Sequence, residues 1–390
     1  MKLRNLMYAT MIACAFASCS KDDVIDNGPD PVAKGDAALT IVVNAEKVGT
    51  KAVKPEGATD ITLANETEIK SLTLVVFNST GAYLGHGTSK DNKVVVEGLV
   101  PQPIKFMVFA NMNIANISTL TSENIFTQAL SLDSEKGFVA ADGLPMASKL
   151  ISDITLVSGN NYYGYSEDEM TDVATGGDHS VGKPLPLYRN VARVDLEAVK
   201  LDMAKSDYVS GTATFQYTGV SIKDAADKAY TSGAVDATAG HVNPVGETYA
   251  FYKNVVSGTL AKKTQEFSST SEAAEVNAEK AYYYVLANTQ SGEGSTPTEL
   301  VVTGKFSLTN AKKAGSDNTY TLAERESSYP IVIGVTGMEE EAVNIEKNKV
   351  YRITLLVAGP GKTDGGDPAK FYVKTKVAEW ETVDQIAPVK

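Results

Sequence analysis

Hydrophobic and smaller or polar residues alternate with a period of two along most of the chain beyond residue 36. The clearest example is Leu39, Ile41 and Val43, which are separated by single residues. Successive side chains of a strand point to opposite faces of its sheet. The pattern therefore predicts a strand over 39–45 with one strongly apolar face.

The same alternation predicts a series of further short strands, separated by clusters of Gly, Asn, Asp and Ser. They are expected over 72–77, 93–97, 104–111, 151–157, 189–200, 212–222, 281–288, 300–308, 331–335, 350–357 and 371–378. Residues 72–83 combine strand, turn and strand signals and predict a hairpin. One helix is expected over 122–130, with Ser122 as its N-cap and with Phe126 and Ala129 facing inward.

Strands dominate this pattern, and no series of alternating strands and helices is present. The economical fold class is therefore all-β, with two antiparallel β-sandwich domains in tandem. A length of 390 residues fits about two domains of ordinary size. A Lys-Pro-Leu-Pro run at 183–186 places the expected boundary near residue 187, which gives domains over 52–187 and 188–390.

The N-terminus has the features of an export signal. Lys2 and Arg4 precede an apolar run over 6–17, which is shorter than the roughly 20 residues of a membrane span. Residues 1–18 are therefore expected to be a signal peptide. Phe16, Ala17 and Ser18 precede Cys19 and resemble a bacterial lipobox, in which Cys19 would carry a lipid. Cys14 is a weaker candidate for the lipidated residue. The other alternative is an ordinary signal peptide in which Cys19 is incidental and carries no lipid.

The composition of the chain argues against several classes of function. The chain has 36 basic and 48 acidic residues, a net charge of −12 and 43% hydrophobic residues, which argues against disorder and against nucleic acid as a partner. The three histidines, at positions 86, 179 and 241, are isolated, and the two cysteines lie at or before position 19. We expect no metal site and no cofactor. No nucleophile, base and orienting acid stand at a recognisable spacing, so no enzyme is expected.

Several short motifs follow one another along the chain. They are Glu68-Ile69-Lys70-Ser71-Leu72-Thr73-Leu74-Val75-Val76-Phe77, Phe109-Ala110-Asn111, Leu144-Pro145-Met146, Arg189-Asn190-Val191-Ala192-Arg193-Val194, Tyr351-Arg352-Ile353 and Val377-Ala378-Glu379-Trp380. In this order, and after a lipoprotein-like start, they resemble the fimbrillin family, the type V pilins of Bacteroidales that include major and minor fimbrial shaft subunits. The resemblance runs from Cys19 to the C-terminus and leaves 162–179 and 221–280 unmatched.

The resemblance implies transthyretin-like domains and a function as a structural pilin that supports adhesion. Such pilins are exported as outer-membrane lipoproteins. A trypsin-like protease then removes the lipidated segment with the first strand, and a C-terminal strand of a neighbouring subunit fills the groove. The implied partners are identical subunits, accessory anchor and tip pilins, the protease and, before cleavage, the outer membrane through the lipid. The mature protein is then expected in a cell-surface fimbrium.

The sequence contains segments that fit the first half of this mechanism. The expected propeptide is 19–51, and its removable strand carries Leu39, Ile41 and Val43. Cleavage is expected between Lys51 and Ala52. Lys47 and Lys34 also precede candidate bonds, although a cut after Lys34 would leave the strand attached. The alternative is that Lys51 is a solvated loop residue.

A donor strand is expected over 381–390. Val383 and Val389 share a face with Ala387, and Ile386 lies opposite, so Val383, Ile386 and Val389 are the predicted donor residues. This alternation is weaker than in the first strand, so the donated segment could begin earlier. A frayed C-terminus is the alternative.

A surface-anchored glycan-binding lipoprotein is the rival hypothesis. Tyrosines at 162, 163 and 165 and at 282–284 would form its stacking platform. Neighbouring positions of a strand face opposite sides, so packing within the sheets is favoured for them. The acidic residues of 167–172 lack EF-hand spacing and are expected in a solvated loop. Arg189 and Arg193 are expected to pair at the surface with Asp195 or Glu197.

Overall fold

The computed structural model describes residues 35–43, 66–132, 137–164, 185–244, 246–248, 262–276, 281–288, 295–333, 344–361 and 371–379. Strands make up the regular structure of these residues. Helical geometry is limited there to single 3₁₀ turns, which are η1 (Ile117–Thr119), η2 (Ile125–Thr127), η3 (Ala140–Asp142) and η5 (Met203–Lys205). Within the described ranges, no helix has the length and apolar character needed to cross a bilayer.

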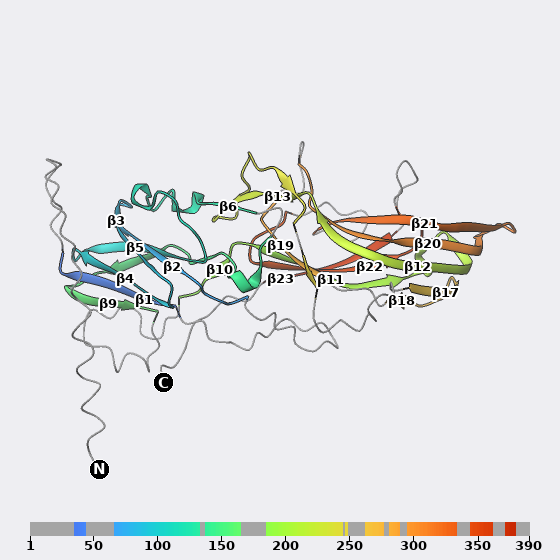
Figure 1. Ribbon diagram of the computed structural model, residues 1–390, viewed down its shortest axis with the longest axis horizontal. Helices are drawn as coiled ribbons and strands as arrows, with labels where there is room; N and C mark the ends of the chain where they lie inside the picture. The colour runs from blue at the N-terminus through green and yellow to red at the C-terminus, as the bar shows by residue number, and fades with distance from the viewer. Residues whose placement is uncertain are drawn as a thin grey trace, which may run out of the picture. The chain divides into compact units, whose positions relative to one another are not determined.

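Two sheets are built from the first half of the chain (Figure 1). The first has the order β4 (Lys93–Leu99), β1 (Ala37–Val42), β9 (Gly159–Tyr163). The second has the order β10 (Tyr188–Arg189), β7 (Met146–Ala147), β5 (Pro103–Ala110), β2 (Leu72–Asn78), β3 (Tyr83–Ser89), with β8 (Ile151–Thr155) also paired to β5.

Two further sheets come from the second half. One has the order β16 (Glu247–Thr248), β19 (Ala281–Val285), β11 (Ala192–Leu201), β22 (Lys349–Val357), β23 (Phe371–Glu379), with β18 (Ala274–Glu275) paired to β11. The other has the order β17 (Lys262–Ser268), β12 (Tyr208–Lys223), β20 (Glu299–Lys313), β21 (Thr319–Val332). Two small pairs complete the described topology: β13 (Ala225–Ala226) with β15 (His241–Val242), and β14 (Lys228–Tyr230) with β6 (Ala129–Ser131).

The all-β fold of tandem β-sandwiches predicted from the alternation is confirmed. Two strand pairs differ from the purely antiparallel expectation. β1 runs parallel to β9, and β11 runs parallel to β22. Parallel neighbours cannot be joined by a tight hairpin, and a long stretch of chain separates the members of both pairs. The boundary near residue 187 stays a prediction, because the contacts of Gly35–Lys390 form one compact unit.

Strand β5 separates two buried clusters of the first half. Phe106 and Val108 belong to the cluster that also contains Leu39 of β1. Met107 and Phe109, which alternate with them, belong to a cluster on the other face. Both faces of this sheet are therefore covered, and a single strand contributes to both cores. A third cluster consists mainly of buried side chains of the second half and also contains Leu130 and Leu144.

The hairpin predicted over 72–83 is confirmed as β2 and β3. Gly81 has a φ of +96°, a region that L side chains rarely adopt, and its N–H donates to the carbonyl of Asn78 at 3.0 Å. The side chain of Asn78 also accepts from the N–H of Ala82 at 2.9 Å. These contacts close the turn and fix the register of the two strands.

The helix predicted over 122–130 is wrong. Its residues form the 3₁₀ turn η2 and the start of β6. Thr121 N–H donates to the side chain of Asn124 at 2.7 Å, and Asn124 N–H donates back to the Thr121 hydroxyl at 3.2 Å. Such side-chain bonds compete with helical ones. Residues 129–131 then pair with β14, a long-range contact that local helix signals do not reveal.

A buried ion network joins the segment before β2 to the sheet of β11. Arg193 donates through Nη1 to both carboxylate oxygens of Glu66, at 2.9 and 3.0 Å, and is paired through Nε with Asp195 at 2.9 Å. Arg352 approaches Asp195 and Glu197 at 3.8 and 3.7 Å. The pairing of Arg193 with Asp195 was expected, but its placement at the surface was wrong, because both side chains are buried.

Two further residues complete the surroundings of Glu66. Arg189, also buried, donates through Nε to the Glu66 carbonyl at 3.0 Å. Tyr284 donates its hydroxyl to the Glu66 carboxylate at 2.7 Å. Burial and the neighbouring Glu66 charge raise the pKa of Tyr284 far above its ordinary value, so the hydroxyl keeps its proton. The carboxylate of Glu66 therefore accepts from two buried donors on the sheet of β11.

We predict that Glu66→Ala lowers the free energy of unfolding by about 3 kcal/mol, because it leaves Arg193 buried with one of its carboxylate partners removed. Denaturant titration of the full chain measures the effect. Glu68→Ala is the matched control, since Glu68 pairs with Lys70 where both side chains are solvated. That variant is expected to lose less than about 1 kcal/mol. Equal losses in the two variants would contradict the assignment.

Candidate functional site: the groove filled by β1

Strand β1 lies between β4 and β9 in the first sheet (Figure 1). It is antiparallel to β4, with Ile41 opposite Val94. It is parallel to β9, with Ile41 opposite Tyr163. Val43, just past the strand, adds a bond from its N–H to the Asn92 carbonyl at 2.6 Å.

In the described part of the chain, β1 is the one ladder partner that β4 has, and likewise the one that β9 has. The two strands do not pair with each other there. Without β1, each would present a row of unpaired N–H and C=O groups facing the space between them. Unpaired strand edges of this kind are templates for another extended chain.

The side chains of β1 fill an apolar trough. Leu39, Ile41 and Val43 are each 0% exposed and belong to the same buried cluster as Val96 and Phe106. The three residues predicted to line the removable strand are thus all in the core. On the opposite face of β1, the side chains at positions 40 and 42 are also buried. A strand in this position is enclosed on both faces as well as along both edges.

The side chain of Asn161 forms a hydrogen bond with the backbone of β1. Its amide nitrogen donates to the carbonyl of Ala38 at 3.1 Å and to those of Val157 and Gly159 at 2.8 and 3.2 Å. Its oxygen accepts from the N–H of Val157 at 2.9 Å. The side chain is fully buried. The bond to Ala38 is made with its backbone carbonyl, so it does not require a particular side chain at that position of the bound strand.

Gly164 ends the parallel side of the groove. Its φ is +88°, and a Cβ on this residue would lie 2.5 Å from the carbonyl oxygen of Val42. Both the backbone angle and the close approach to β1 require glycine here. The pattern of the sequence did not indicate β9, Asn161 or Gly164, since they lie next to or within the segment that matched no motif.

The other predicted site residues lie outside the described residues. These are the lipid attachment residue Cys19, the cleavage residues Lys51 and Ala52, and the donor residues Val383, Ile386 and Val389. Their roles stay predictions. The described segment nearest to the predicted donor is β23, which pairs with β22 and ends at Glu379.

The described tyrosines of the two segments pack within the sheets, as the strand alternation favoured, whereas Tyr165 and the acidic residues of 167–172 lie outside the described residues. Tyr163 of β9 meets Phe106 edge-on, with ring centroids 5.1 Å apart. Tyr282, Tyr283 and Tyr284 are all buried, and the Tyr283 hydroxyl donates to the carbonyl of Val220 at 2.9 Å. These rings contribute to cores rather than to an exposed stacking surface.

The chemistry of the groove is backbone pairing and apolar burial. In the ranges that the structure describes, no three His, Cys, Asp or Glu side chains gather closely enough to hold a metal ion. What the groove can do is accept one extended segment, by hydrogen bonds along two edges and by alternate apolar side chains.

Comparison with known proteins agrees with this geometry. The family model described as the major fimbrial subunit protein (FimA) matches residues 37–189, a stretch that begins at the first residue of β1. A major fimbrium subunit FimA type-3 of Porphyromonas gingivalis is 25% identical, and the alignment covers 99% of each chain. The chain is therefore similar to the fimbrillins.

Two further proteins extend the similarity. A FimA type-2 subunit of the same species is 26% identical over 99% of this chain and 100% of that one. The crystal structure of a fimbrilin from Porphyromonas gingivalis W83 superposes with a TM-score of 0.57 at 18% identity, covering 91% of this chain and all of that one. The structural likeness supports the same fold.

We predict that Ile41→Ala lowers the free energy of unfolding of the full chain by about 2–5 kcal/mol, because it leaves a cavity in a fully buried site. Val95→Ala is the matched control: it removes the same kind of aliphatic side chain from the neighbouring strand, where Val95 is 37% exposed. The control is expected to lose less than about 1 kcal/mol. If chemical denaturation gives the two variants the same loss, β1 does not fill the groove in solution.

Proposed function

We propose that this protein is a fimbrillin, a structural subunit of a surface fimbria that is exported as a lipoprotein, activated by proteolysis and polymerised by donor-strand exchange. The observation that carries the proposal is the position of β1 as the shared ladder partner of β4 and β9. A strand so placed can be exchanged only for another strand. The full-length similarity to major fimbrium subunits supports the same reading.

Before cleavage, β1 keeps the groove closed. It is part of the same chain as the groove, so its effective concentration there exceeds that of any strand arriving from another molecule. A cut near the bond between Lys51 and Ala52 would remove this advantage and allow β1 to leave. Assembly must then wait for the protease, which prevents polymerisation during export.

After cleavage, the donor would bind tightly. Each fully buried aliphatic side chain contributes roughly 1.5–3 kcal/mol, and β1 supplies three that are 0% exposed. With the new ladder on two edges, the gain is on the order of 10 kcal/mol before the cost of ordering the tail. Once β1 has left, binding of a donor strand to the empty groove would therefore be effectively irreversible, as an extracellular fibre requires.

The tail at 381–390 is the proposed donor. It follows β23 directly, and β23 is an end strand of its sheet in the described topology. A segment leaving this position can extend away from its own subunit. Donation by this tail would make the protein a shaft subunit, since a tip subunit has no need to donate onward. Anchor and tip pilins at the fibre ends, and an adhesive function of the fibre, complete the proposal.

We predict that Lys51→Gln accumulates lipidated precursor and few fibres, because the groove stays closed. Deletion of 381–390 is expected to give processed subunits that fold but do not extend a chain, because the donor is absent. Gels of unboiled surface-sheared protein separate the two defects by size, and N-terminal sequencing shows whether cleavage has occurred. If Lys47 is used instead of Lys51, the sequencing identifies that bond.

Mixing the two variants tests donor and acceptor together. The processed tail-deleted subunit has an open groove, whereas the Lys51→Gln subunit has a tail and a closed groove. The mixture should yield dimers and nothing longer. Long fibres from either variant alone would refute the assignment.

We predict that Cys19→Ala abolishes lipidation and mislocalises the precursor, because a thiol-linked diacylglycerol would supply the membrane attachment. Metabolic labelling with a fatty acid measures this directly. Cys14→Ala is the matched control and should retain the label. Label that persists in Cys19→Ala and disappears in Cys14→Ala would move the anchor to the earlier cysteine.

A further inference from the structure

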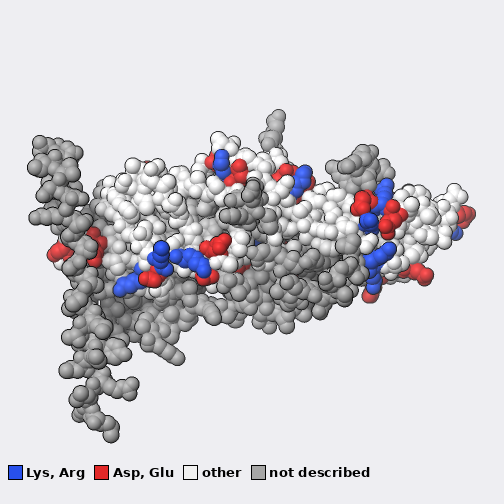
Figure 2. All heavy atoms as spheres, viewed as in Figure 1, with Lys and Arg blue, Asp and Glu red and all other residues white. Residues whose placement is uncertain are grey.

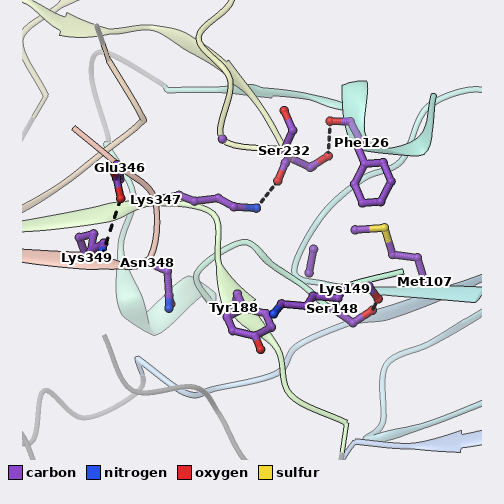
Figure 3. A pocket seen from close by; sticks show the side chains of 13 residues that line it. Met107, Phe126, Ser148, Lys149, Tyr188, Ser232, Glu346, Lys347, Asn348 and Lys349 are labelled. Atoms are coloured by element: carbon purple, nitrogen blue, oxygen red, sulfur yellow. Dashed lines mark hydrogen bonds and ion pairs between the residues drawn. The ribbon is translucent and has the colours of Figure 1, made fainter. Parts of the chain in front are cut away.

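A cavity of about 580 Å³ lies on the other face of the sheet from the β1 groove (Figure 3). Met107 of β5 and Ala147 of β7 line it, and both belong to the cluster opposite the one that holds β1. The remaining lining comes from η2, from the two residues after β7, from β10, from the turn after β14, and from the start of β22 with the residues that lead into it. This volume is within the range of about 300–1,000 Å³ typical of small-molecule sites.

One side of the cavity is apolar. Figure 3 shows Met107 and Phe126 side by side, with Tyr188 across the cavity from Phe126. Met107 and Ala147 are buried, whereas Phe126 and Tyr188 are half-buried and so keep surface that a ligand can cover. A small molecule with an apolar ring face would find a matching wall here.

The rim is cationic. Lys149, Lys347 and Lys349 line the cavity together with one acidic residue, Glu346, so three lysines and one glutamate leave a net charge of +2. The chain as a whole carries −12. On the face drawn in Figure 2, basic and acidic side chains of the described residues lie next to one another. A local excess of amines is therefore unusual for this protein, and it favours an anion.

The three amines differ in their partners. Lys149 lies over the ring of Tyr188, with Nζ 5.4 Å from the ring centroid. Lys349 is 3.8 Å from the carboxylate of Glu346, which is itself well exposed. Lys347 donates to the Asn190 side chain at 3.1 Å and to the Thr231 carbonyl. An ammonium group has three donors, so these two bonds leave Lys347 with one for a ligand.

Burial makes an anion more favourable at Lys347 than at a solvated lysine. The side chain is half-buried, and desolvation lowers its pKa below the ordinary value. A negative group beside the ammonium would offset the cost of that burial. Ser232, at the rim, accepts from the N–H of Ala234 at 3.1 Å and keeps its own hydroxyl proton to donate.

We propose that this cavity binds a carboxylated sugar ring, of the hexuronic acid class. The amines of Lys149 and Lys347 would pair with the carboxylate, the apolar wall would take the C–H face of the ring, and Ser232 would donate to a ring hydroxyl. Inorganic phosphate would also pair with these amines, which bind it as point charges. The apolar wall would contribute nothing to a bare inorganic anion.

Ligand binding at this cavity does not depend on strand exchange. The cavity and the β1 groove lie on opposite faces of β5, so ligand binding is expected in the full precursor chain with β1 in place. If the protein does not bind a sugar, the proposal of fibre assembly still stands. If the protein does not polymerise, the proposal of a ligand site in the cavity still stands.

Ligand-observed NMR titration of the full chain with sodium glucuronate tests the proposal. We expect saturable binding, with glucose at least tenfold weaker because it lacks the carboxylate. Lys149→Gln should weaken glucuronate about tenfold, the effect of one charge-assisted contact. Lys90→Gln, which changes an exposed lysine in the turn between β3 and β4, is the matched control and should leave the dissociation constant unchanged.

A second variant tests the cavity without altering its charge. Ser232→Trp places a large ring at the rim from an exposed position and should abolish binding of glucuronate. Thermal unfolding of each variant establishes that the fold is retained. Equal affinity for glucose and glucuronate, competition by acetate as strong as that by glucuronate, or unchanged binding in both variants would overturn the proposal.

Discussion

The sharing of β1 by two strands is the constraint on which the first half of the structure depends. β4 and β9 come from distant parts of the sequence, and β1 brings them into one sheet. The apolar cluster beneath them is closed by the same strand. A segment that completes both a ladder and a core cannot be lost without a substitute, which links its removal to the binding of another chain.

Much of this arrangement was predictable from the sequence. Leu39, Ile41 and Val43 alternate because their face of β1 packs into the apolar cluster of the first half. Asn78 and Gly81 indicate the turn of the hairpin formed by β2 and β3. Pairing direction was not predictable, since the alternation of a strand is the same for parallel and antiparallel neighbours. The helix expected over 122–130 failed for a related reason, because pairing with β14 decided the conformation of its last residues.

The polar contacts were harder to foresee. Glu66 and Arg193 are 127 positions apart, and Asn161 and Ala38 are 123 apart. Acidic and amide side chains are usually exposed, so nothing local distinguishes a buried Glu66 from its exposed neighbour Glu68. Their roles depend on the folded topology. Lys149 is likewise far in the sequence from Lys347 and Lys349, and it meets them only where β7 and β22 approach the same space.

β11 occupies in its own sheet the place that β1 occupies in the first, with antiparallel β19 on one side and parallel β22 on the other. Arg193 of β11 is held in buried pairs by Glu66 and Asp195. One cut can free β1 but not β11. If β1 is the exchangeable strand and 381–390 the donor, each subunit offers one acceptor groove and one tail of a different kind. Units of this kind join head to tail into unbranched filaments whose two ends are chemically different.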